Sequence, residues 1–120
     1  DMGFTDVRFI KIDVEGHEDA VIRGALKTIE RDHPVLFVEL EERMTDINGT
    51  IEFLATLGYE ARFVMNDVWT SSASMDLALW QREFTRTHPT QSYLQTVVRG
   101  NGYVNDVAFV HPKSTWSPWT

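Results

Sequence analysis

Apolar positions alternate along the chain between strand-like and helix-like patterns. Near-continuous or alternating apolar runs predict strands at residues 7–12, 35–40, 59–65 and 107–110. Apolar residues three to four positions apart predict helices at about 18–31 and 46–57. Thr45 or Asp46 could cap the second of these helices, and Gly58 stands where a helix commonly ends.

The pattern is weaker after the third strand. A helix is expected at 75–86 and a shorter one at 91–98, which together suggest a helical insert over about 68–102. The last eight residues hold two Trp and one Pro and are expected to be irregular. His33, His88 and His111 each precede a proline and are interpreted as boundary residues.

This order of elements predicts an α/β fold. Strands alternate with helices through residue 65, which favours a mostly parallel sheet flanked by helices. Right-handed crossovers would place consecutive strands side by side. The carboxyl ends of such strands are where functional groups gather.

Composition narrows the classes of partner. The net charge is −7 and the pI is about 4.9, which disfavours nucleic acid and anionic membranes. No apolar run approaches the roughly 20 residues that a membrane span needs. Cysteine is absent, so thiolate metal sites and a Cys nucleophile are excluded. We expect a cytoplasmic protein that acts on a small molecule.

Charged residues concentrate after the first two strands. Asp13, Glu15 and His17 follow the first strand, and Glu39 ends the second. Neighbouring parallel strands would direct these groups to one crevice, where they are candidate catalytic residues. Structural roles remain open: Asp13 could cap the next helix, Glu15 could be a solvated acid at its start, and His17 could be a surface histidine. Glu39 needs a partner or a ligand if it is buried.

Two further groups have simpler interpretations. Glu41 and Glu42 are expected to form a solvated acidic turn. The aromatic residues Trp80, Phe84 and Tyr93 are expected to form the core of the inserted helices rather than a substrate cage.

The segment FIKIDVEGHEDAVIRGALKTIERDHPVLFVELEE resembles the signature of the FkbM family of S-adenosylmethionine-dependent methyltransferases. The matching positions are Lys11, Asp13, Val14, Glu15, Gly16, Glu18, Gly24, Ala25, Pro34 and Glu39. The resemblance is strong over residues 7–42, fair to residue 65 and thin over 68–101. It implies the C-terminal half of a Rossmann-like class I methyltransferase, strands four to seven, with an antiparallel last strand.

The resemblance also limits what can be inferred about the cofactor. The family holds S-adenosylmethionine mainly in its first half, through a glycine-rich loop that has no counterpart here. The cofactor-binding residues therefore stay unknown, and the chain alone is expected to bind the cofactor negligibly. The implied reaction is O-methylation of a hydroxyl group on a sugar or secondary metabolite.

Methyl transfer to a hydroxyl requires removal of a proton, which a carboxylate or imidazole can accept. Alternatively, Asp13 and Glu39 could bind a divalent cation that acidifies the hydroxyl, although this arrangement is not typical of the family. Two other classes remain open: a non-catalytic α/β binding module, and a metal-dependent hydrolase built on the same two acids. Asp13 and Glu39 are expected at the same sheet edge, on adjacent parallel strands.

The outer edge of the first strand is expected to lack a partner strand. If the first half of the fold is missing, residues 7–12 form an exposed strand edge, which is a template for pairing with another chain. Self-association is therefore expected, or else cover of that edge by the Trp-containing tail.

Overall fold

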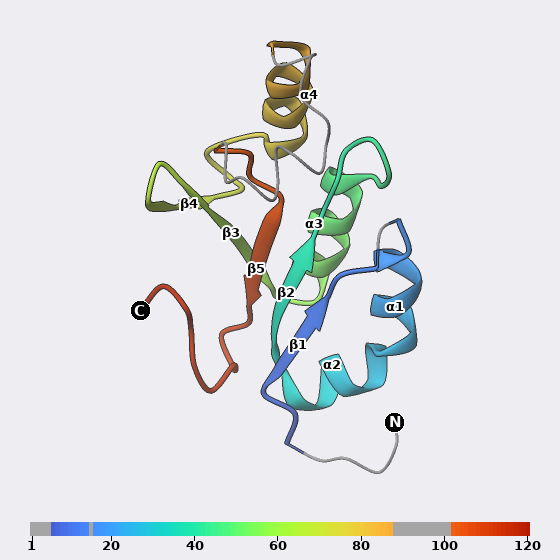
Figure 1. Ribbon diagram of the computed structural model, residues 1–120. Helices are drawn as coiled ribbons and strands as arrows, with labels where there is room; N and C mark the ends of the chain where they lie inside the picture. The colour runs from blue at the N-terminus through green and yellow to red at the C-terminus, as the bar shows by residue number, and fades with distance from the viewer. Residues whose placement is uncertain (1–5, 15, 88–101) are drawn as a thin grey trace.

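The structure is a computed structural model that describes residues 6–14, 16–87 and 102–120. The elements in chain order are β1 (Phe9–Ile12), α1 (Glu18–Gly24), α2 (Leu26–Asp32), β2 (Val35–Glu39), α3 (Ile47–Thr56), β3 (Glu60–Met65), β4 (Val68–Ser71), α4 (Leu77–Thr87) and β5 (Asp106–Val110). The five strands form one sheet in the order β1-β2-β5-β3-β4, shown in Figure 1. The α/β class is confirmed.

The expectation of a mostly parallel sheet is wrong. Among the described strands, only the β1–β2 pair is parallel; the β2–β5, β5–β3 and β3–β4 pairs are antiparallel. The reason is that β5 returns from the far end of the chain and inserts between β2 and β3. Consecutive strands are therefore not all neighbours. Because β2 and β3 both oppose β5, they still point the same way, as β1 does.

The first predicted helix is two helices. Ala25 leaves helical geometry (φ −98°, ψ 8°) and separates α1 from α2. Gly24, a weak helix former, ends α1 at this point. Each short helix buries one isoleucine completely, Ile22 in α1 and Ile29 in α2.

The third helix begins and ends where the sequence predicts. The Asp46 side chain accepts a hydrogen bond from the Gly49 N–H, which caps α3. Its C-cap is Leu57, and Gly58 follows with a φ of +96° that glycine adopts readily.

Residues 68–102 contain a strand as well as a helix. Asn66 and Asp67 both have positive φ, which is the geometry of a tight hairpin turn, and they connect β3 to β4. This dipeptide was a signal that sequence reasoning missed. The helix expected at 75–86 is confirmed as α4, whereas the one expected at 91–98 lies outside the described residues.

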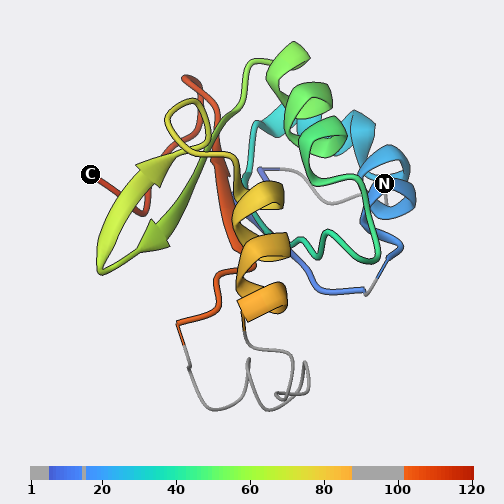
Figure 2. The same ribbon diagram turned by 90° about the horizontal axis from the view of Figure 1, so that it is seen from above.

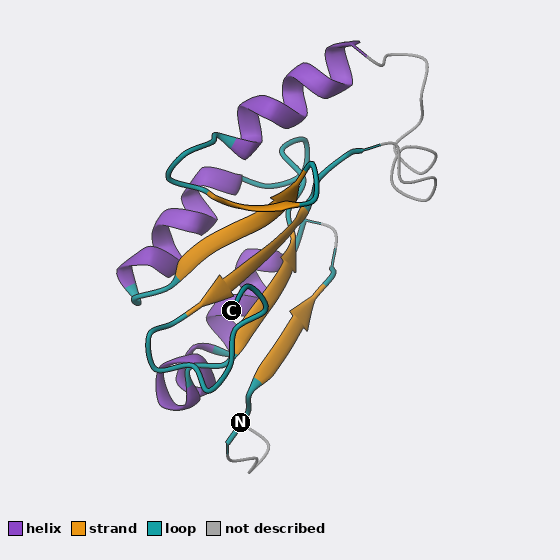
Figure 3. Cartoon of the chain, turned by 90° about the vertical axis from the view of Figure 1, so that its left-hand side faces the viewer, coloured by secondary structure: helices purple, strands orange, loops and turns teal. Residues whose placement is uncertain are grey.

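The two faces of the sheet differ. Helices α1, α2 and α3 cover one face, and the C-terminal tail crosses the other, as Figures 2 and 3 show. The core lies on the helix-covered face, and its largest fully buried side chains include Ile12, Ile22, Ile29, Leu36, Leu40, Ile47, Leu54, Phe63 and Phe109. The opposite face, hereafter the open face, has no helix over it among the described residues. Phe9 of β1 lies on this face and is 43% exposed. The expectation that β1 is buried on both faces is therefore wrong.

Candidate functional site

Three carboxylates line up at one edge of the sheet. Asp13 directly follows Ile12, the last residue of β1, and Glu39 directly follows Val38, the partner of Ile12, so both acids stand at the same end of two neighbouring parallel strands. Glu39 pairs in turn with Asp106, the first residue of β5. Glu39 and Asp106 line the open face together with Lys11, and the charge of Asp13, just past the end of β1, acts on Asp106. We call Asp13, Glu39 and Asp106 the acidic row.

The expected placement of Asp13 beside Glu39 agrees with this register. Sequence reasoning missed Asp106, because nothing local indicates that β5 inserts beside β2. The only available signal was an acid at the start of a strongly apolar strand.

Electrostatics connects the members of the row. Partial burial raises the pKa of the Asp106 carboxyl above its ordinary value of 3.8. The Lys11 charge opposes this increase, whereas the negative charge of Asp13 adds to it. The side chain still reaches solvent, so a ligand arriving at this edge can contact it.

A pocket of about 470 Å³ lies on the open face next to the row. Glu39, Asp106 and Lys11 supply its charged lining. The rest of the lining is mainly apolar or aromatic and includes Phe9, Phe37, Val64, Trp69, Tyr103, Val104 and Ala108. Such a mixture suits a ligand with an apolar body and a polar end.

Glu41 is a second functional candidate that sequence reasoning misjudged. It was expected in a solvated turn, but only 3% of its surface is exposed. It accepts hydrogen bonds from the Tyr103 hydroxyl at 2.6 Å and from Asn105 Nδ2 at 2.9 Å. Burial, with the bond to Glu41 as a lesser cause, raises the pKa of Tyr103 far above its usual value. Glu41 therefore holds the segment that forms one wall of the pocket.

Helix α4 supports the same wall through Gln81. The Gln81 amide, which is almost fully buried, donates to the carbonyl oxygens of Leu40 and Val104 and accepts from the Glu42 N–H. Glu42 itself is half-buried near Arg82. The sequence did not indicate a role for Gln81 or Asn105, because the role of each depends on contacts with distant segments.

The aromatic group on α4 differs in membership from the prediction. Trp80 and Phe84 pack on each other with ring centroids 5.1 Å apart, and Tyr103 is their third partner, at 5.8 and 5.3 Å. Tyr93, the expected third member, lies outside the described residues.

The remaining predicted site residues stand apart from the row. His17 is exposed at the N-cap of α1, and its ring makes no capping hydrogen bond. Glu15 lies outside the described residues. Glu18, in the first turn of α1, is buried and accepts a hydrogen bond from the Gly16 N–H at 3.0 Å. This contact holds the turn after β1, where Gly16 has a φ of +87°.

In the described part of the chain, no three His, Cys, Asp or Glu side chains gather closely enough to hold a metal ion. The geometry therefore offers no support for the cation-based alternatives. In addition, no helix among these residues is long and apolar enough to cross a membrane.

The fold and the acidic edge define an α/β protein with a ligand-sized pocket beside the carboxyl ends of its parallel strands. The family model of the methyltransferase FkbM domain matches residues 1–61, about half of the chain. The chain therefore belongs to the FkbM methyltransferase family, and the resemblance inferred from the sequence is confirmed. No curated protein and no solved structure matches it.

Proposed function

We propose that this chain is the acceptor-binding part of an S-adenosylmethionine-dependent O-methyltransferase. Membership of the FkbM family supports methyl transfer. The observation that carries the finer proposal is the acidic row, which stands beside a mainly apolar pocket at one sheet edge. The acceptor is a hydroxyl group on a sugar or other secondary metabolite whose apolar parts fit the pocket.

The strand arrangement supports a Rossmann-like origin of the sheet. Strands β1, β2 and β3 point the same way, and the last strand, β5, is antiparallel to its neighbours. These are the features that the resemblance implies for strands four to seven of a class I methyltransferase.

The described residues do not by themselves fit the cofactor. A loop that cradles the cofactor needs glycines where its backbone approaches closely. The loop after β1 has Gly16, but an added Cβ there would meet Met44 only at an ordinary distance of 3.6 Å. This glycine therefore serves a turn rather than a close approach. We propose that other parts of the complete domain hold the cofactor.

The chain's own residues act on the acceptor. Asp13 and Glu39 orient its hydroxyl group by accepting hydrogen bonds. Asp106 takes the proton, because its raised pKa makes it a stronger base than an ordinary aspartate. The apolar lining excludes water from the rest of the acceptor. When bound, the cofactor supplies the activated methyl group.

An isotope-labelled methyl-transfer assay tests this proposal. It uses these residues joined to the cofactor-binding half of an FkbM domain, with a panel of hydroxylated acceptors. We expect Asp106→Asn to lower kcat by about 100-fold, a typical loss for a general base, with a smaller change in KM. Asp13→Asn should move the basic group's apparent pKa downward in the pH–rate profile, because Asp13 raises the pKa of Asp106.

The matched control is Asp67→Asn, in the exposed β3–β4 turn, which should leave the rates unchanged. Wild-type kcat in Asp106→Asn would contradict the proposed base. Calorimetry provides a separate check: the 120 residues alone should show no binding of S-adenosylmethionine. Micromolar binding would contradict the proposal that other parts of the domain hold the cofactor.

A further inference from the structure

The C-terminal tail is fastened beside two stacked histidines. His111 directly follows β5, and His33 is the C-cap of α2 in left-handed geometry (φ 49°). Their ring centroids lie 4.1 Å apart. The Tyr59 ring contacts His111 edge-on at 5.3 Å. Segments 78 residues apart in the sequence thus meet at one aromatic contact.

Hydrogen bonds close this junction. The Lys113 N–H donates to His111 Nδ1 at 3.0 Å, so this nitrogen must carry a lone pair. Ser114 Oγ accepts from the His111 N–H at 3.0 Å and donates to the His33 carbonyl at 2.7 Å. These three bonds hold the first residues of the tail against the end of α2, and the one from Lys113 exists only while Nδ1 of His111 is unprotonated.

Beyond the junction, the tail crosses the open face. The Trp116 indole N–H donates to the Arg8 carbonyl at 3.0 Å, and its ring packs near Phe9 and Phe37, with centroids at 6.1 and 6.5 Å. Both phenylalanines also line the pocket. The tail therefore shares side chains with the wall of the candidate site.

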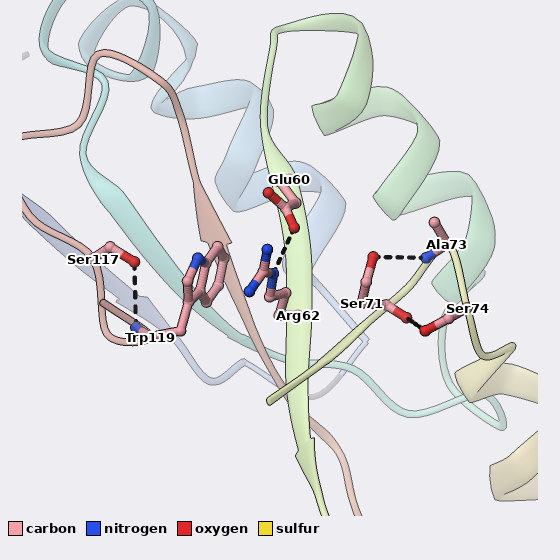
Figure 4. A network of polar contacts seen from close by, with 7 residues as sticks. All are labelled: Glu60, Arg62, Ser71, Ala73, Ser74, Ser117 and Trp119. Atoms are coloured by element: carbon pink, nitrogen blue, oxygen red, sulfur yellow. Dashed lines mark hydrogen bonds and ion pairs between the residues drawn. The ribbon is translucent and has the colours of Figure 1, made fainter. Parts of the chain in front are cut away.

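Trp119 makes the second contact of the tail, shown in Figure 4. Its ring lies 4.6 Å from the Arg62 guanidinium. It also lies 5.6 Å from the ring of Trp69, which lines the pocket. Arg62 is held from the other side by Glu60. The tail thus bridges the open face from β1 to the β3–β4 hairpin.

We propose that His33 and His111 form a pH-sensitive latch, which keeps the C-terminal tail on the open face at neutral pH and releases it in acid. Protonation of His111 would remove the acceptor of the Lys113 N–H. It would also place a cation against the His33 ring and the Lys113 charge. The inference rests on the junction alone and does not depend on methyl transfer.

The surrounding groups favour a neutral His111. Burial lowers its pKa below the ordinary 6.5, the His33 and Lys113 charges lower it further, and a hydrogen bond to the Leu57 backbone opposes them. Two carboxylates line surface pockets together with these histidines: Glu30 on α2 with His33, and Glu60 at the start of β3 with His111.

Acid weakens the contact between His111 and the tail. A histidine with a lowered pKa contributes its full stability above the ordinary pKa of 6.5 and loses it as the pH falls through the lower value of the folded protein. For each unit by which the folded protein lowers the pKa of His111, protonation shifts the equilibrium between held and released tail about tenfold toward release.

Nuclear magnetic resonance on the whole chain tests the latch, with the Trp116 indole N–H as reporter. Between about pH 7.5 and pH 5, where histidine titrates, we expect its signal to move to the position of a free indole. The midpoint should coincide with that of the His111 ring. His111→Phe keeps an aromatic ring but cannot titrate, so its Trp116 signal should not respond to pH.

His17→Gln is the matched control, because it removes an exposed histidine outside the junction, and it should respond as the wild type does. A Trp116 signal that stays fixed while His111 titrates would overturn the latch. So would an unchanged pH response in His111→Phe. If that variant fails to fold, the coincidence or separation of the two wild-type midpoints decides the question.

Discussion

Glu41 shows how one side chain can depend entirely on distant partners. Its neighbour Glu42 has the same chemistry and is half-buried near solvent, whereas Glu41 is buried against Tyr103 and Asn105, more than 60 residues away. A carboxylate in such a place is stable because neutral donors satisfy both of its oxygens.

We predict that Glu41→Ala lowers the free energy of unfolding by about 2–4 kcal/mol, since it removes the acceptor of two donors at a buried site. Glu42→Ala is the control and should change it by less than about 0.5 kcal/mol, because its contact with Arg82 is long and partly exposed. Urea denaturation measures both. Equal effects of the two substitutions would contradict the role assigned to Glu41.

At the scale of elements, backbone geometry decides where helices end. Gly58 terminates α3 with a positive φ, and an added Cβ would lie only 2.6 Å from His111 Nε2. Gly24, by contrast, lies in helical geometry with nothing within 4 Å of such a Cβ. The conformation and surroundings of position 58 thus require glycine, whereas those of position 24 do not.

We predict opposite effects for alanine at these two positions. Gly58→Ala should lower the free energy of unfolding by about 1–3 kcal/mol through backbone strain and collision with His111. Gly24→Ala should raise it by about 0.4–1 kcal/mol, because alanine favours the helix and restricts the unfolded chain. Thermal unfolding followed by circular dichroism separates the outcomes. A stabilising effect of Gly58→Ala would contradict the prediction, because it would show that alanine is not strained at the end of α3.

At the scale of the whole molecule, the sheet is covered on one face and has an unpaired edge. Among the described residues β1 pairs only with β2, so its outer edge carries no partner strand. The tail that was considered as a cover crosses the open face rather than pairing with this edge.

We therefore predict self-association through β1. Light scattering at high protein concentration should give a mass above the 13.8 kDa of one chain. Phe9→Lys should reduce the association, because a charged side chain at an exposed strand edge opposes pairing. Val68→Lys is the control at the opposite edge, on β4, and should not reduce it. A monomer at every concentration would contradict this prediction.

The sequence by itself determined the local features of this protein. Apolar runs located β1, β2, β3 and β5, because burial of a strand imposes its pattern on consecutive residues. The pair Thr45–Asp46 and Gly58 marked the ends of α3, because caps act within one helical turn. The motif around Asp13 and Glu39 indicated the family for the same reason: it lies in one short stretch.

Only the tertiary structure decided which elements become neighbours. The insertion of β5 between β2 and β3 placed Asp106 in the acidic row, buried Glu41 and brought His111 to His33. A periodic pattern predicts which side of a helix or strand is buried, but it does not predict which other element packs against that side. Burial of a charged or polar side chain depends on partners far along the chain, and its energetics are set only when those partners meet.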